Sequence, residues 1–205
     1  MPILDPESSP PRKDPDLLAR LLGIFAPVEA GEGVSALLLT LNVFVVLVAY
    51  YFLKTVREPL ILAGGDLTIG SLSIGRAELK TYASVGQAVL LIGMVRAYAA
   101  LARRLGRMLL SAAILLFFAS NLVIFYLLAR LSVPLGVPFY LWVGCFSVTV
   151  IAQFWSFATD VYTPEQGKRL FAIVGVGSSL GAVFGAKIAQ LIFKPVGPYN
   201  MMLVV

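Results

Sequence analysis

Long apolar segments recur along the chain and alternate with short polar or charged ones. A helix needs about 20 apolar residues to cross the roughly 30 Å hydrocarbon core of a bilayer. The predicted spans run over 34–53, from about Glu78, over 108–129, from Pro138 to Thr159, and from just after Arg169. The pattern predicts an all-α membrane protein with about five complete spans.

The two ends of the chain differ from this pattern. Residues 1–16 are rich in proline, serine and acidic residues, and they lack the basic and apolar regions of a signal peptide. Apolar residues at helical spacing over 17–25 predict a short interfacial helix. We therefore expect a cytoplasmic tail with that helix over 1–32 and a transmembrane domain over 33–205. The last residues are apolar again but too few to cross, so we expect the start of a sixth span there.

Composition supports the membrane assignment and excludes several functions. Of the 205 residues, 59% are hydrophobic and 13% are charged, whereas globular domains have about 45–50% and 25%. The sequence contains no histidine and one cysteine, Cys145, which excludes His-based triads, His-containing zinc sites and an intramolecular disulfide. We expect no enzyme, no metal site and no cofactor.

The distribution of positive charge predicts the partner and the topology. The formal net charge is +5, and the basic residues flank the apolar spans. This is typical of membrane proteins, so we expect the lipid bilayer and no nucleic acid as a partner. Counting lysine and arginine on each side favours a cytoplasmic N-terminus in a multi-pass protein of the inner (plasma) membrane.

The end of the first span carries charge. If the helix continues beyond the apolar run, Tyr50, Lys54 and Arg57 share one face. Pro59 is expected to bend or end this helix, and a connector too polar to span follows over 63–75. Lys54 and Arg57 either extend to the membrane interface or bind an anion in an aqueous cavity.

Two further spans carry polar stripes. Lys80, Ser84 and Gln87 fall on one face of the second span. Polar residues in a bilayer normally face the bundle or a water-filled path, because a charge at the midplane costs at least about 2.5–3.5 kcal/mol. For Ser84 and Gln87, hydrogen bonds between helices are the alternative. The fourth span has a predicted polar or amphipathic face formed by Trp142, Thr149, Gln153, Ser156 and Asp160.

Small residues repeat every fourth position in the fifth span, at Gly177, Gly181, Gly185 and Ala189. Small residues at this spacing let two helix backbones approach closely. The repeat therefore predicts helix packing and no ligand site.

Three segments carry a resemblance to a known family. They are LKTVREPLIL at Leu53–Leu62, ELKTY at Glu78–Tyr82, and FWSFATDVYTPEQGKRLFAIVGVG at Phe154–Gly177. Together they resemble the nucleotide transporter family of ATP/ADP antiporters of plastids and intracellular bacteria, a major facilitator-like family. The third segment is the longest and the most specific.

The resemblance implies a bundle of about twelve spans in two halves around a nucleotide-binding cavity. This chain would be the N-terminal half, with the C-terminal half missing from it. Lys80 matches the lysine of the family's LKTW segment, and Lys54, Arg57 and Glu58 match a charged trio. Lysine and arginine provide charge-assisted hydrogen bonds to phosphate oxygens, and Glu58 would pair with a basic residue when the site is empty.

The polar face of the fourth span predicts that Gln153, Ser156 and Asp160 line the transport path. Val143 stands where the ATP/ADP exchangers have a glutamate, and Thr159 stands where they have an asparagine. The substrate is therefore a nucleotide or another anionic small molecule. Two alternatives remain: a major facilitator permease for another solute, and a non-transporting membrane anchor or sensor.

Overall fold

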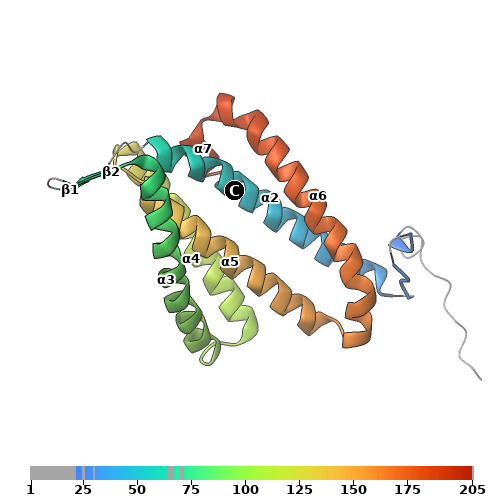
Figure 1. The fold of residues 1–205 in the computed structure, drawn as a ribbon. Helices are drawn as coiled ribbons and strands as arrows, with labels where there is room; N and C mark the ends of the chain where they lie inside the picture. The colour runs from blue at the N-terminus through green and yellow to red at the C-terminus, as the bar shows by residue number, and fades with distance from the viewer. Residues whose placement is uncertain (1–21, 25, 30, 64–66, 70–71, 205) are drawn as a thin grey trace, which may run out of the picture.

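The computed structural model describes residues 22–204 except 25, 30, 64–66 and 70–71. The predicted tail, and most of its interfacial helix, lie outside the described residues. The described helices are α2 (Gly33–Ala63), α3 (Arg76–Ala102), α4 (Arg107–Arg130), α5 (Gly136–Val161), α6 (Pro164–Val196) and α7 (Pro198–Met201) (Figure 1). Five of them are long and apolar enough to cross a membrane. The prediction of an all-α, multi-pass membrane protein is confirmed at this level.

The polar connector between α2 and α3 contains a small β-hairpin. Strands β1 (Leu67–Ile69) and β2 (Leu72–Ile74) pair antiparallel, with Thr68 opposite Ser73. The connector was correctly predicted not to span, but its strands were not predicted.

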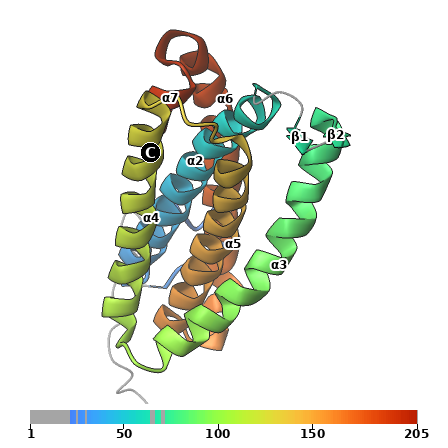
Figure 2. The ribbon, with the colours of Figure 1, turned by 90° about the vertical axis from the view of Figure 1, so that its left-hand side faces the viewer.

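The long helices run up and down, so the bundle has two ends. One end holds the start of α2, the turn between α3 and α4, and the turn between α5 and α6; we call it the basic end, after Arg103, Arg104 and Arg107 (Figure 2). The other, the hairpin end, holds the end of α2, the β-hairpin and the start of α3 (Figure 2).

Of the two outcomes predicted at Pro59, a bend or a helix end, the structure excludes the end, and the predicted start of the fifth span was wrong. Pro59 lies inside α2, which continues to Ala63, because the last turns are held by packing: Leu60 and Ile61 are buried. Neighbouring helices commonly make proline tolerable within membrane helices. At the other boundary, α6 begins at Pro164 and not after Arg169, because Thr163 and Gln166 form a capping box and proline occupies the first turn.

The apolar residues after α6 form a four-residue helix where the start of a sixth span was expected. Gly197, at φ 78°, separates α6 from α7. Met201 and Met202 are then fully buried in the core that α2, α4 and α5 share. The chain turns here because a positive φ is accessible to glycine at little cost.

Helices α2 and α6 are in backbone contact along the glycine repeat. A Cβ atom added at Gly181 would lie 2.6 Å from the carbonyl oxygen of Phe44 and 2.9 Å from its Cα. Gly177 and Gly185 meet Thr40 and Val48 in the same way. The prediction that these glycines pack helices is confirmed.

Aromatic side chains join α4 to α5. Trp142 stacks on Phe139 and Phe146, with ring centroids 5.8 and 5.6 Å apart, and makes an edge contact with Phe118. Its side chain is buried. The prediction that Trp142 belongs to a polar helix face was wrong, because the large ring is recruited into the core and aromatic pairs stabilise beyond their buried area.

Replacing Gly181 with alanine tests the contact between α2 and α6. We expect Gly181→Ala to lower the melting temperature of the purified protein, because an overpacked contact typically costs about 1–3 kcal/mol. Gly175→Ala is the matched control in the same helix, since an added Cβ there meets nothing within 4 Å. The control should be neutral or stabilising by up to about 1 kcal/mol. Equal effects of the two substitutions on the melting temperature would contradict the close contact between Gly181 and α2.

Candidate functional site

An acidic side chain joins two basic ones at the hairpin end. Glu58, in the last turns of α2, accepts a bond from Lys80 of α3 with Nζ and Oε2 2.6 Å apart. Its other oxygen lies 3.1 Å from the Arg57 guanidinium. The Glu58 side chain is 35% exposed and that of Lys80 is 41% exposed. Both carboxylate oxygens are therefore engaged, and both side chains are partly exposed at the surface of the described chain.

Arg57 connects this cluster to α5. Its side chain is 14% exposed, and the guanidinium carbon lies 4.4 Å from the ring centroid of Tyr140, which is a cation–π distance. The Tyr140 hydroxyl is 3.0 Å from Ser84 Oγ. Sequence reasoning missed Tyr140, since nothing in its own segment indicates partners on α2 and α3.

One donor of Arg57 is unused. Its Nε is buried and has no hydrogen-bond partner among the described residues. An unsatisfied buried donor costs about 1–3 kcal/mol, and more when it is charged. The site therefore contains a buried positive group with spare capacity for an acceptor.

Lys54 lies one helical turn before Glu58 but has different partners. Its Nζ is 5.3 Å from the ring centroid of Tyr51 and 5.9 Å from that of Tyr50. Within the described part of the chain it forms no ion pair. Lys54 is thus a half-buried cation that no carboxylate of the described residues neutralises.

The polar stripe of α3 faces the bundle. Lys80 and Ser84 bond to α2 and α5 as described. A Cβ atom at Gly144 of α5 would overlap the Gln87 side chain, so that amide packs directly on the α5 backbone. Each of the three residues therefore contacts a neighbouring helix, Lys80 on α2 and Ser84 and Gln87 on α5.

Gln153, Ser156 and Asp160 lie elsewhere. Tyr140 and Asp160 are 20 residues apart on α5, which at 1.5 Å per residue is about 30 Å. The three residues line a cavity of about 650 Å³ at the basic end, together with residues of α3 and α4. The structure therefore splits the predicted site residues into two groups, with Lys54, Arg57, Glu58 and Lys80 at the hairpin end.

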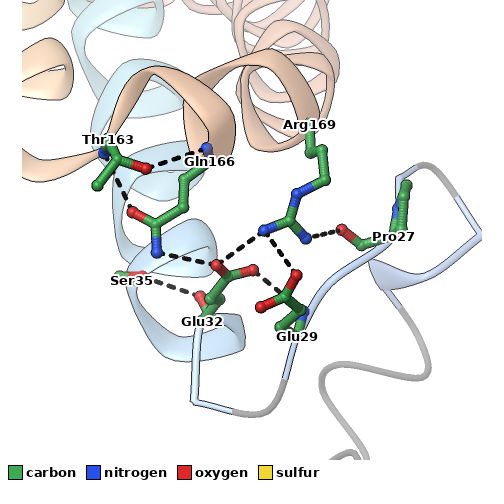
Figure 3. Close-up of polar contacts among 7 residues, drawn as sticks. All are labelled: Pro27, Glu29, Glu32, Ser35, Thr163, Gln166 and Arg169. Carbon is green, nitrogen blue, oxygen red and sulfur yellow. Dashed lines mark hydrogen bonds and ion pairs between the residues drawn. The ribbon is translucent and has the colours of Figure 1, made fainter.

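A third polar cluster, which sequence reasoning missed, fastens α6 to the segment before α2 (Figure 3). Arg169 NH2 lies 3.1 Å from both Glu29 and Glu32, and its NH1 donates to the Pro27 carbonyl at 2.9 Å. The Gln166 amide donates to Glu32 at 2.9 Å. We call these residues the latch. The capping-box pattern Thr163–Gln166 could have indicated the helix start, but nothing in the sequence indicates the partners of Gln166 and Arg169.

Glu32 is the centre of the latch. Burial, the largest single influence, opposes its ionisation, but bonds from the Glu29 amide, Gln166 and Arg169 outweigh it and hold the pKa of Glu32 below its ordinary value of 4.5. Its side chain is 11% exposed. The latch therefore depends on a charged Glu32.

Comparisons with protein-family models, with curated proteins and with solved structures find no match. The resemblance to nucleotide transporters therefore stays a prediction from short motifs. Among the described residues, no three or more cysteine, aspartate and glutamate side chains are grouped as a metal site would need.

The latch predicts a pH dependence of stability. Because the folded-state pKa of Glu32 is lowered, its contribution is present above the unfolded pKa and is lost as the pH falls through the folded one. We expect Glu32→Gln to lower the melting temperature at pH 7, and the difference from the unchanged protein to shrink as the pH falls below about 4.5.

Glu165→Gln is the matched control for this experiment. Glu165 lies at the same end of α6, is exposed, and forms no ion pair in the described part of the chain. Thermal unfolding across the pH range should show little change in the control. A parallel pH profile for Glu32→Gln and the unchanged protein would overturn the role given to Glu32.

Proposed function

We propose that the protein is a membrane transporter, or the N-terminal part of one, that moves a nucleotide or another phosphorylated anion by alternating access. The observation that carries the proposal is the half-buried Glu58 held between Arg57 and Lys80. Ionisable residues within membrane-spanning helices are rare and commonly mark substrate pathways. The motif resemblance points to the same residues.

In this proposal, Glu58 occupies the basic groups while no substrate is bound. A phosphate oxygen arriving at the site would replace the carboxylate on Lys80 and Arg57 and would bring acceptors for the unused Arg57 Nε. Arginine offers several donors in one plane and suits phosphate, whereas lysine acts as a point charge. Lys54 would add a third positive charge beside the site. When the anion leaves, the Glu58 carboxylate can return to Lys80 and Arg57, which favours reversible binding.

The proposal assigns Gln153, Ser156 and Asp160 no direct contact with the bound anion, because they lie near the opposite end of the bundle. The major facilitator-like architecture remains part of the proposal. So does the orientation, in which the basic end faces the cytoplasm of a cell with the protein in its inner (plasma) membrane, as the arginine distribution favours.

Two other functions fit parts of the same structure. A permease for a different solute would share the bundle but would not need phosphate at Lys80. A membrane anchor or sensor would use the ion pair between Glu58 and Lys80 only to join α2 to α3. Neither alternative requires an acceptor for the Arg57 Nε, which is buried without a hydrogen-bond partner among the described residues.

Removing the Lys80 charge tests the site. In proteoliposomes of the intact protein, Lys80→Ala should abolish uptake of radiolabelled ATP and ADP. Lys80 is the proposed anion ligand, and in the described part of the chain it is also the only partner of Glu58 from another helix. Lys80→Arg should retain part of the activity. Lys194→Ala removes an equal charge from the exposed end of α6 and should leave uptake unchanged. Full uptake of ATP and ADP by a folded Lys80→Ala variant would contradict the assignment of Lys80 as an anion ligand. If the unchanged protein takes up other solutes but no nucleotide, the permease is favoured.

Neutralising Glu58 separates binding from turnover. Glu58→Gln leaves Arg57 and Lys80 without a competing carboxylate, so we expect labelled nucleotide to bind at least as tightly and the exchange rate to fall. Equilibrium binding and counterflow measured on the same preparation give the two quantities. Weaker binding in this variant would mean that Glu58 holds the basic groups in place and does not compete with the substrate.

A further inference from the structure

We propose that the basic end of the bundle binds an anionic phospholipid, with the headgroup in the cavity that Asp160 lines and an acyl chain between α3 and α4. The inference is independent of any transport activity. It rests on the shape of two adjoining cavities and on an excess of positive charge at the mouth of one of them.

The first cavity has the size and polarity of a headgroup site. It measures about 650 Å³ and lies among the end of α3, the start of α4 and the end of α5. Its polar side chains are Tyr98, Arg107, Ser111, Gln153, Ser156 and Asp160. These supply hydrogen-bond donors and acceptors of the kind that hydroxyl and phosphate groups use.

The second cavity is an apolar groove that continues from the first. It measures about 260 Å³, and Tyr98 lines both. Its walls are Met94, Ala97 and Leu101 of α3, with Ala113, Ile114 and Phe117 among those of α4. The one other polar group, the Thr149 hydroxyl, already donates to Met94 Sδ at 3.3 Å. A polar solute gains nothing from this groove, whereas an alkyl chain fits it.

The two cavities together match the depth of one bilayer leaflet. Met108 lines the first and Phe118 the second, and ten residues of helix rise about 15 Å. This is half of the roughly 30 Å hydrocarbon core. A lipid with its headgroup at the basic end therefore places its chain along the groove.

The charge at the cavity mouth selects an anionic headgroup. Arg103 and Arg104 stand in the turn between the lining residues Ala102 and Leu105, are exposed, and form no ion pair in the described part of the chain. Arg107 forms one pair, with Asp160 at 2.7 Å, and is 82% exposed. The segment from Ala102 to Arg107 thus carries three positive charges beside the one negative charge of Asp160 in the cavity lining.

The start of α4 adds to this positive potential. Its N-cap is Gly106, which offers no side-chain acceptor, and its first turn contains no acidic residue. The N-terminal end of a helix carries a partial positive charge, so arginine there is unfavourable unless an anion is close. A phosphate between these groups would satisfy both the helix end and the unpaired arginines.

Native mass spectrometry of the intact protein tests the proposal. Dioleoyl-phosphatidylglycerol and dioleoyl-phosphatidylcholine are added separately to the detergent-solubilised protein, and the bound lipid is counted. We expect phosphatidylglycerol to bind at least tenfold more tightly. The combined substitution Arg103→Gln, Arg104→Gln and Arg107→Gln should remove this preference. Arg130→Gln, at the other end of α4, should keep it, because that arginine contacts only its own helix through Tyr126 among the described residues.

A second variant tests the groove without changing charge. Ala113→Phe places a ring in the apolar cavity, and we expect it to weaken phosphatidylglycerol binding several-fold while melting behaviour is retained. Equal binding of the two lipids to the unchanged protein would overturn the proposal. So would a preference that survives the triple substitution. Binding of inorganic phosphate in place of the lipid, unaffected by Ala113→Phe, would show that the cavity takes a free anion and would also overturn it.

Discussion

The direct contact between the α2 and α6 backbones is the constraint on which the rest of the bundle depends. Lipid chains are as apolar as leucine, so helices in a bilayer gain little from burying apolar surface and associate mainly by close packing and polar contacts. Gly177, Gly181 and Gly185 remove the side chains that would hold the two helices apart. With α6 fixed on α2, the latch closes one end of the pair, α5 packs on another face of α2, and α3 packs mainly on α5.

Charged groups then hold the ends of the helices rather than their centres. Glu58 joins α2 to α3 at the hairpin end, while Arg169 joins α6 to the segment before α2 at the basic end. Exposed ion pairs contribute about 0–1 kcal/mol each, but partly buried, hydrogen-bonded ones lose more when one partner is removed. The two clusters differ in how far their acidic side chain is enclosed. Glu32 is enclosed by donors from three residues, whereas Glu58 and Lys80 remain accessible, which is the property that a binding site requires.

Sequence patterns predicted the fold better than the site. Length and apolarity were enough to find all five long helices, and the glycine spacing predicted which faces touch. Helix ends differ from those expected where packing or a local hydrogen bond outweighs helix propensity. Packing keeps α2 from ending at Pro59, and the capping box starts α6 before Arg169. The periodicity of α5 placed Trp142 with Gln153 and Asp160, because a 3.6-residue repeat gives a shared face but not the neighbour of each residue. Tyr140, Glu29 and Glu32 were missed for the same reason, since their partners come from distant segments.

The latch also sets an order of events during synthesis. Glu32 and Arg169 are 137 residues apart, and at 5–20 residues per second a ribosome needs roughly 7–27 s to make that length. Throughout this interval the face of α2 that carries Thr40, Phe44 and Val48 has no α6 to pack against, although α3, α4 and α5 are made during it. The contact that brings the α2 and α6 backbones together can therefore form only after the other four long helices have been made.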